Sequence, residues 1–451
     1  MYVITLTRMT SAISSARAAS PKSSLPSLPT LPAEFISFLR SNGLPTSTYT
    51  SLLTYALANR PTPSSKPSLP SRFIHPTFHP THSRPSPLQI STALNIPPED
   101  LTPISWLPSP QLEFYRLPGS VRMAPCELYK QGRVQALDAG SAVAVHALSL
   151  DPDDHVLDLC CAPGGKLSLC AEIVRLGRGT VTGVDVSASR LGITKSVLGK
   201  LGNGSKTRLF LADGRAFDIG VARGNVYWRG KEFGLGVDAE RVRDEKEDET
   251  WAGWERGPVW DEDKVEVRTK GYLIPQTFKR GRIEVGQIDT SVFVPYDKVL
   301  VDAECTHDGS IAHILKYITI EPPSPSSPNG QPTFAFPSAL LASLSTASPS
   351  STLPDLQLNL LRNGFRLLKP NGVLVYSTCS LSVNQGEVIV QRFLDELNKE
   401  GERVKAQLED VPGREEMPCE EPDVNWLEGK ALRFSGKLVE GKEKDWLSGL
   451  A

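Results

Sequence analysis

Short apolar strands alternate with helices between residues 139 and 376, and this alternation restricts the chain to few folds. The expected strands are 155–159, 180–184, 207–212, 298–301 and 372–376, and the expected helices are 139–148, 167–176, 189–201 and 354–367. Strands of this apolar kind, separated by helices, build a parallel sheet that is covered on both faces. We therefore expect an α/β domain with a doubly wound, mostly parallel sheet.

The residues before this domain differ from it in composition and charge. Residues 1–98 contain eight Lys or Arg and one acid, a balance that suits nucleic acid or an import signal. Ser- and Ala-rich residues 1–30 predict a disordered or transit-like tail, and apolar spacing predicts two short helices within 33–57. Residues 61–88, rich in Pro and Ser, predict a linker. We expect residues 31–130 to form a small α-rich or α+β extension.

Two stretches interrupt the alternation in the remaining domain, which we expect to span 131–451. Residues 221–292 are charged and contain Trp, and residues 321–352 are rich in Pro and Ser. Both predict surface insertions, and we expect 240–250 and 322–350 to be mobile. The sequence contains no run of eighteen uncharged apolar residues, so we expect no membrane partner.

Acidic residues stand at the ends of four expected strands: Asp158, Asp185, Asp213 and Asp302. Ligands of doubly wound sheets bind beyond the carboxyl ends of the strands. The Gly-rich segment from Asp158 to Lys166 predicts a close backbone approach to a ligand, Asp185 suits a ribose diol, and Asp213 suits an adenine amino group. Each acid alone has the alternative of a helix cap, but three in register favour an adenosyl cofactor.

Two of the seven cysteines, Cys305 and Cys379, lie on loops at the same strand ends. Cys126 and Cys170 are expected to be buried small hydrophobes. No pair of CxxC clusters is present, so we expect no metal site and no disulfide framework. Free thiols favour an intracellular, reducing compartment: nucleus, nucleolus, cytoplasm or mitochondrion.

Five segments in this order resemble a known family. They read DLCCAPGGK, VDVSASR, LADGRAFD, VLVDAEC and LLKPNGVLVYSTCSL. Over roughly residues 130–395 the chain is similar to the Nop/Sun family of RNA cytosine-5 methyltransferases. The resemblance implies a Rossmann-like fold, S-adenosylmethionine as cofactor and RNA as partner. It also implies that the N-terminal extension, residues 31–130, helps to bind RNA. Transfer RNA is favoured over ribosomal RNA, and a monomer is favoured.

The resemblance also implies roles for individual residues. Cys379 would be the nucleophile, Cys305 would assist release, and Asp302 would contact both cofactor and target base. The implied cofactor-binding residues are Cys160, Cys161, Ala162, Pro163, Gly164, Gly165, Lys166, Asp185, Arg190, Asp213 and Asp302. A thiolate that adds to carbon-6 of cytosine makes carbon-5 nucleophilic, which agrees with these roles.

The chain departs from the family pattern at two places. Glu304 stands where the family usually has Pro, and we expect its carboxylate to raise the pKa of the Cys305 thiol. After Phe434 the family continues into a last strand pair, which this sequence does not match. Three alternatives stay open: an rRNA-directed enzyme of the same family, a DNA cytosine-5 methyltransferase, which Cys379 and Glu304 disfavour, and an RNA-binding assembly factor with vestigial catalysis.

The acid at the end of the second strand gives a direct test of the cofactor site. Asp185→Ala is expected to weaken S-adenosylmethionine binding by about 1–3 kcal/mol, the usual cost of leaving a buried hydrogen-bonding group without a partner. Isothermal titration calorimetry would measure the change. An unchanged affinity would remove Asp185 from the site.

Overall fold

A computed structural model describes most of the chain outside its longest insertion and its two ends. The described residues are 2–5, 31–42, 46–58, 71–107, 109, 111–221, 225–228, 231–234, 295–315, 318–321, 333–336, 353–380, 382–399, 406, 408–417 and 431–432. Among these residues no helix combines the length and the apolar character that a membrane span needs.

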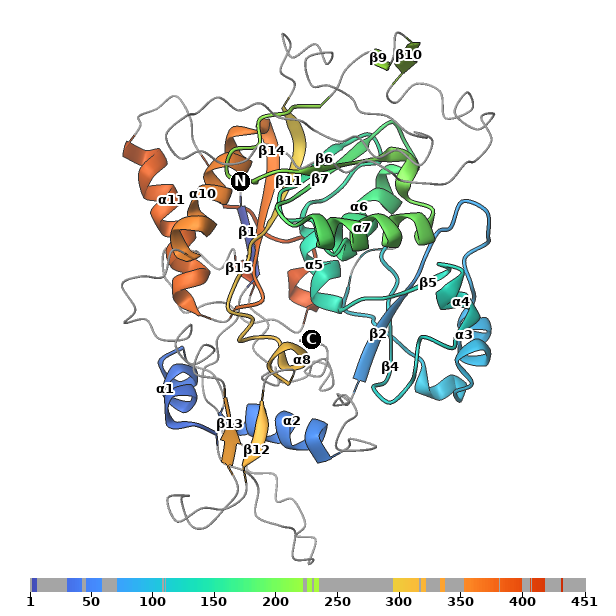
Figure 1. The fold of residues 1–451 in the computed structure, drawn as a ribbon, viewed down its shortest axis with the longest axis vertical. Coiled ribbons are helices and arrows are strands. Elements are labelled where there is room, and N and C mark those ends of the chain that lie inside the picture. The colour runs from blue at the N-terminus through green and yellow to red at the C-terminus, as the bar shows by residue number, and fades with distance from the viewer. Residues whose placement is uncertain are drawn as a thin grey trace, which may run out of the picture.

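A seven-stranded sheet, ordered β15-β1-β14-β11-β6-β7-β8, forms the centre of the molecule (Figure 1). Its strands are β1 (Tyr2–Thr5), β6 (His155–Asp158), β7 (Thr180–Asp185), β8 (Thr207–Leu211), β11 (Tyr296–Asp302), β14 (Leu368–Ser377) and β15 (Ala431–Leu432). Every pairing in this sheet is parallel. The expected doubly wound α/β fold is confirmed.

Helices cover both faces of this sheet. They are α5 (Ala139–Ala147), α6 (Gly165–Val174), α7 (Ala188–Leu201), α10 (Leu353–Arg366) and α11 (Glu387–Lys399). One apolar cluster joins α5, α6 and α7 to side chains such as Val156 and Leu300, and another joins α10 and α11 to their neighbours Leu157 and Val301. Because successive strand residues point to opposite faces, strands that are apolar throughout supply both cores.

The order of the strands fixes where a ligand can bind. From β6 the chain winds outward through β7 to β8, then returns to the other side of β6 with β11 and β14. The direction of winding therefore reverses between β6 and β11. In open α/β sheets the binding crevice lies at such a reversal, beyond the carboxyl ends of the strands.

A second, antiparallel sheet, ordered β3-β4-β2-β5, belongs to the N-terminal part. Its strands and the short helices beside it are β2 (Ser71–Pro76), α3 (Pro87–Leu94), η1 (Pro98–Asp100), β3 (Thr102–Pro103), β4 (Tyr115–Pro118), α4 (Glu127–Lys130) and β5 (Val134–Ala136). The α+β character of the extension is thus as expected. The expectation of a linker over 61–88 is wrong for β2, which pairs with both β4 and β5. Phe73 and Ile74 of this strand are buried, but the many Pro and Ser residues around them gave the segment the composition of a linker.

The two expected N-terminal helices are α1 (Ala33–Ser41) and α2 (Thr46–Ala58). They share an apolar cluster with Ile314, Ile318 and Phe336, which come from the region between β11 and α10. This region contains α8 (Ile311–Ile314), β12 (Thr319–Glu321) and β13 (Thr333–Ala335). The extension also reaches the segments that follow β11 and β14: Val383 N–H donates to Asn42 Oδ1 at 3.1 Å, and Tyr49 O–H donates to Asp308 O at 3.5 Å.

Parts of the tail and of the insertions also form strands. Tyr2–Thr5, within the expected tail, is strand β1 between β14 and β15, so the tail is not wholly unstructured. Tyr2-Val-Ile-Thr5 is a run of β-forming residues hidden in a Ser- and Ala-rich segment. In the first insertion β9 (Asn225–Trp228) pairs with β10 (Lys231–Gly234). Residues 6–30, 240–250 and 322–332 lie outside the described residues, so the expected mobility of the insertions stays a prediction.

A buried acid joins the antiparallel sheet to the catalytic domain. Glu172 on α6 accepts a hydrogen bond from Phe78 N–H at 2.9 Å, and its Oε1 lies 3.1 Å from Nε2 of His75. Both side chains are buried. The bonds cross from β2 and the residues after it to α6, so Glu172 fixes the extension against the parallel sheet.

Replacement of this acid tests that connection. Glu172→Ala is expected to lower the free energy of unfolding by about 1–3 kcal/mol, because it leaves buried groups without partners. Urea denaturation would measure the loss. The matched control is Glu127→Ala, which removes an exposed ion pair with Lys130 and should change stability by less than about 0.5 kcal/mol. Equal effects of the two variants would contradict the role of Glu172.

Candidate active site

The Gly-rich turn between β6 and α6 is held by the neighbouring strand. Cys161 N–H donates to Val184 O at 2.9 Å. Gly164 has a φ of +100°, and a Cβ atom there would lie 2.9 Å from Thr194, so only glycine fits. Helix α6 starts at Gly165, and its first N–H groups have no partner within the helix. The turn therefore offers backbone hydrogen-bond donors next to the point, between β6 and β11, where the direction of winding reverses.

Asp185 at the end of β7 contacts this turn directly. Its carboxylate accepts hydrogen bonds from Ala162 N–H at 3.2 Å and Ser187 N–H at 2.8 Å. Arg190 donates to Ala162 O at 2.6 Å and approaches Asp185 at 3.9 Å. A carboxylate has about four acceptor positions, so Asp185 retains capacity for the hydroxyls of a ribose. Asp185, Arg190 and the turn thus form one unit.

Asp302 at the end of β11 lies beside the same turn. Its carboxylate accepts hydrogen bonds from Lys166 Nζ at 2.8 Å and Ser377 Oγ at 2.6 Å. Burial disfavours the Lys166 charge, but the Asp302 and Asp138 carboxylates outweigh burial and raise the pKa of Lys166. The ion pair joins the cofactor turn to the strand that leads to Cys305.

Three other expected residues have different surroundings. The Asp213 carboxylate is paired with the Arg215 guanidinium at 2.6 Å, an interaction that the sequence did not predict. Burial raises the pKa of the Cys160 and Cys161 thiols well above the usual range, so both stay protonated. These two cysteines can contribute packing and backbone groups, but no thiolate.

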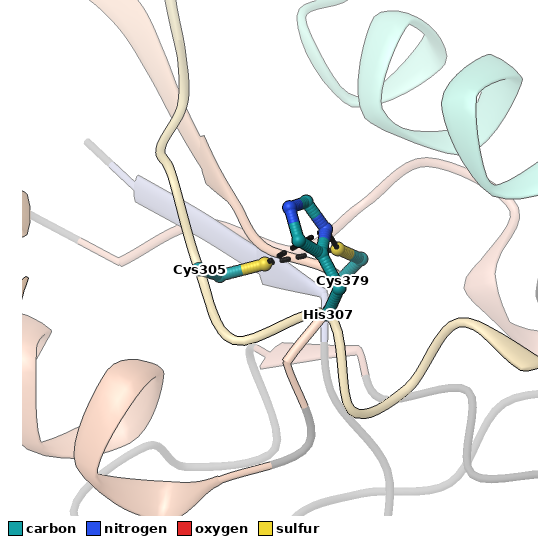
Figure 2. Close-up of side chains that lie close together, drawn as sticks. All are labelled: Cys305, His307 and Cys379. Atoms are coloured by element: carbon teal, nitrogen blue, oxygen red, sulfur yellow. Dashed lines mark hydrogen bonds between the residues drawn. The ribbon is translucent and has the colours of Figure 1, made fainter. Parts of the chain in front are cut away.

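The two loops that carry Cys305 and Cys379 meet at the carboxyl ends of β11 and β14 (Figure 2). The Sγ atoms of the two cysteines lie 2.9 Å apart. Cys305 is buried, whereas Cys379 is exposed. The structure thus brings the two thiols together, and only Cys379 is open to a large substrate.

A third residue, His307, joins this pair. Its Nδ1 atom lies 2.8 Å from Sγ of Cys379 and 3.7 Å from Sγ of Cys305 (Figure 2). No sequence motif predicted a role for His307. Its spacing of two residues from Cys305 was a possible signal, but the contact with Cys379 spans 72 positions and depends on the loop conformation.

Buried polar side chains fix the two loops to each other. Ser380 O–H donates to Asp308 at 2.6 Å, and Thr306 O–H bonds the same carboxylate. Gln385 accepts from Thr306 N–H at 3.1 Å and donates back to its hydroxyl at 2.9 Å. These contacts hold the residues beside both cysteines, so the thiols are fixed in place by their supporting loops.

The two thiols share a single negative charge. A hydrogen bond from Cys379, opposed by burial, lowers the pKa of Cys305 well below its usual range, and the same contact raises the pKa of Cys379. With sulfurs 2.9 Å apart, the proton that stays can sit on either atom. The expectation that Glu304 raises the pKa of Cys305 is wrong: Glu304 is exposed, and the partner thiol and His307 dominate.

The same three residues have donor atoms within 4.8 Å of one another, which raises the question of a metal. Two thiolates bound to one tetrahedral Zn²⁺ at about 2.3 Å would lie roughly 3.7 Å apart. The sulfurs of Cys305 and Cys379 are much closer, at 2.9 Å. We therefore interpret the group as a hydrogen-bonded set that shares protons.

The last acid of the crevice, Asp158, is 1% exposed. Burial, and next the Asp302 carboxylate, raise the pKa of Asp158 to about 8. The unfolded chain loses this proton near pH 3.9. Between about pH 5 and 8 the folded state therefore binds a proton that the unfolded state has released, so stability falls as pH rises.

Asp158→Asn, which mimics the protonated acid, should remove this loss. We expect the variant to gain stability over the wild type as the pH rises from 5 to 8, by on the order of a few kcal/mol. Urea unfolding at several pH values would measure the difference. The control, Asp153→Asn, should show no slope, because hydrogen bonds from Arg178 lower the pKa of this exposed acid. A constant difference between Asp158→Asn and wild type would contradict the buried proton.

Parts of this chain are similar in sequence to known RNA methyltransferases. A model of the family described as 16S rRNA methyltransferase RsmB/F matches residues 145–227 and 345–417. The 5-cytosine rRNA methyltransferase NSUN4 of Bos taurus is 27% identical over 334 residues, 73% of this chain and 62% of the bovine protein. The nsun-4 protein of Caenorhabditis elegans is 28% identical over 255 residues, 56% of this chain and 36% of the nematode protein. The chain thus spans less than two thirds of these relatives.

Solved structures of similar fold come from Pyrococcus horikoshii. A methyltransferase homologue has a TM-score of 0.43 at 20% identity, with 81% of this chain and 83% of that chain covered. NSun6 with SFG has a TM-score of 0.43 at 14% identity, with 85% and 91% covered. The family model matches on both sides of the long insertion, in the segments that hold the Gly-rich turn and Cys379. The resemblance read from the sequence is confirmed: the chain is similar to the RsmB/F, or Nop/Sun, family of S-adenosylmethionine-dependent methyltransferases.

Proposed function

We propose that this protein methylates carbon-5 of cytosine in RNA, with S-adenosylmethionine as methyl donor. The observation that carries the proposal is the 2.9 Å separation of the Cys305 and Cys379 sulfurs beside the cofactor turn. A pair of thiols fits a reaction in which one sulfur adds to the base and another group must help to remove a proton. The printed names of both relatives above specify 5-cytosine methylation of rRNA.

Cys379 is the proposed nucleophile, because its thiol is exposed while that of Cys305 is buried. Its thiolate would form a bond to carbon-6, and the electrons of the carbon-5–carbon-6 double bond would then form the bond from carbon-5 to the methyl group. The bond between the methyl group and the sulfonium sulfur would break, and its electron pair would stay on that sulfur, which leaves as a neutral thioether. Cys305 would take the proton from carbon-5, so that the double bond re-forms and Cys379 leaves. The contact between the sulfurs lowers the pKa of Cys305 and raises that of Cys379, so the thiolate forms first on Cys305 and would reach Cys379 by transfer of the proton between the two sulfurs.

Asp302 would hold the target base. The Lys166 and Ser377 contacts fix its carboxylate beside β11 and leave acceptor capacity for the exocyclic amine of cytosine. Such a hydrogen bond stabilises the charge that develops when sulfur adds to the ring. Lys166 has a second role, because it ties the position of the base to the cofactor turn.

The residues of the crevice fit the methyl donor. S-adenosylmethionine supplies a methyl group on a positively charged sulfur. Cys160 to Lys166 would face it with backbone groups, Asp185 would accept its ribose hydroxyls, and Arg190 would hold the turn through Ala162 O. Asp213, although paired with Arg215, keeps acceptor capacity for the adenine amine.

Ribosomal RNA is the first substrate to assay, because the relatives' names specify it. The sequence-based preference for transfer RNA stays a prediction, as does the monomeric state. The six described cysteines are free, and the reaction needs thiols, so we infer a reducing compartment. Bisulfite sequencing of total RNA from cells with and without the gene would identify the modified cytosine.

The two cysteine variants should fail differently. Cys379→Ala should neither methylate RNA nor attach to it, because no covalent bond can form. Cys305→Ala should still add to cytosine and transfer the methyl group, but it should release the product slowly. Tritium transfer from labelled cofactor and denaturing electrophoresis of protein–RNA adducts would measure both effects.

The buried Cys170→Ala variant serves as control, because its thiol lies in the core and should not take part. An adduct trapped by Cys379→Ala and absent from Cys305→Ala would reverse the two roles. RNA binding without any incorporation by the wild type would favour the assembly factor.

A further inference from the structure

His307 has no part in the chemistry above, although its ring contacts the reacting sulfur. Nδ1 lies 2.8 Å from Sγ of Cys379, within hydrogen-bond distance. The second thiol, on Cys305, is 3.7 Å away from the same nitrogen. One ring nitrogen therefore faces both sulfurs of the pair (Figure 2).

The backbone and a second ring hold His307 in this position. Its φ is +54°, a left-handed conformation that few side chains adopt. Ser310 N–H donates to His307 O at 3.0 Å, and Gly309 N–H donates to Cys379 O at 3.0 Å. The ring stacks on His313 with centroids 4.1 Å apart. A strained backbone fixed by these contacts is the kind of feature that clusters at active sites.

The charged groups around His307 favour a proton on its ring. The hydrogen bond to Cys305 raises the pKa of His307, burial opposes it, and the Asp308 and Glu304 carboxylates raise it further. The Asp302 and Asp308 carboxylates also disfavour a negative charge on Cys379, and Lys166 is close enough to interact with it. One thiolate and one imidazolium is therefore the balanced state.

We propose that His307 is a further catalytic residue, which holds the proton taken from the thiol pair and later accepts the proton of Cys305, so that the Cys305 thiolate can act during product release. This role rests on the proposed function. A histidine beside a cysteine is a recurrent means of activating a thiol.

The proton count closes over one turnover. In the reactive state, which is reached when the proton of Cys379 moves across the 2.9 Å contact to Cys305, His307 is an imidazolium, Cys305 is a thiol and Cys379 is a thiolate. Cys379 adds to carbon-6 and becomes a neutral thioether as carbon-5 takes the methyl group. The imidazolium has then lost its counter-ion, and it gives its proton to water. Neutral His307 takes the proton of Cys305.

Release completes the cycle. The Cys305 thiolate accepts the proton from carbon-5, and the electrons of that bond re-form the double bond. The carbon–sulfur bond breaks, and Cys379 leaves as a thiolate. The starting state is restored with one proton released to water, which matches replacement of a hydrogen by a methyl group.

The test measures how readily the Cys379 thiol ionises in the absence of RNA. His307→Asn keeps a residue that tolerates a positive φ and places an amide near the position of Nδ1, but it cannot hold a proton at neutral pH. The rate of alkylation of Cys379 by iodoacetamide, followed by peptide mass spectrometry between pH 5 and 10, reports the thiolate. We expect the variant to react roughly tenfold more slowly at pH 7, since each pKa unit changes the thiolate fraction tenfold.

Two further variants sharpen the result. His146 lies on α5, and its ring is hydrogen-bonded to Pro412 O, so His146→Gln should alkylate like the wild type. His307→Gly accepts the same φ and leaves a space for a ring, so added imidazole should restore its alkylation rate. A wild-type pH profile in His307→Asn would overturn the proposal.

Methyl incorporation measured at several pH values distinguishes the role of His307 from the proposed methylation of RNA. His307→Asn should lose incorporation most at pH 7 and recover toward the wild type near pH 9, where hydroxide removes the thiol proton. An equal loss at every pH would mean that His307 only supports the loop. If the wild type methylates no RNA but alkylation still depends on His307, the proposed function fails while the proton-holding role stands.

Discussion

The parallel pairing of β11 with β14 determines the positions of Asp302, Cys305 and Cys379, the groups that we propose to react. In its register Asp302 lies opposite Ser377, so the loops that follow start side by side. Ala303 N–H donates to Ser377 O at 3.2 Å, which continues the pairing into the loops and toward both cysteines. A slip of one residue would turn Asp302 to the other face of the sheet and separate it from Lys166. The apolar residues of both strands prevent this slip, because each is matched to one of the two cores.

Several carboxylates and two thiols lie close together in the crevice, where negative charges would repel one another. Hydrogen bonds and retained protons reduce this repulsion. Asp185 and Asp302 accept hydrogen bonds from backbone and side-chain donors, and Asp158 keeps its proton instead. The thiol pair limits itself to one charge by sharing a proton. Lys166, Arg190 and Arg215 stand beside the remaining carboxylates Asp302, Asp185 and Asp213, so each of these acids has a cationic neighbour.

The sequence predicted the catalytic domain well, because its signals are local. Strand and helix bounds differ from the structure by few residues, and the acids fall at strand ends as expected. Strands β1 and β2 were missed, since each is a short run of β-forming residues inside a segment whose average composition suggests a tail or a linker. Averages over a window lose such short strands.

Site residues were predictable where they belong to a motif, and not where they depend on a loop conformation. Cys305, Cys379 and Asp302 could be placed from strand ends alone. The contact of His307 with Cys379 and the pairing of Asp213 with Arg215 need coordinates, because each depends on backbone turns that no spacing rule gives. The expectation that Glu304 raises the pKa of Cys305 failed for the same reason. Glu304 is next to Cys305 in the sequence, but the partner thiol and His307 determine the pKa of Cys305.

The contacts of α1 and α2 with the catalytic loops have a consequence for biosynthesis. Asn42 is 341 positions from Val383, and Tyr49 is 259 positions from Asp308, so these contacts are among the most remote along the chain. A ribosome completes the N-terminal helices long before the segments that they touch. Their apolar faces, with Phe35 and Leu39 in the cluster shared with Ile314, must wait uncovered or bound by a chaperone. Contacts of such separation form slowly. The cysteine loops therefore gain their final support only when almost the whole chain has left the ribosome, which delays a reactive thiolate until the fold that contains it is nearly complete.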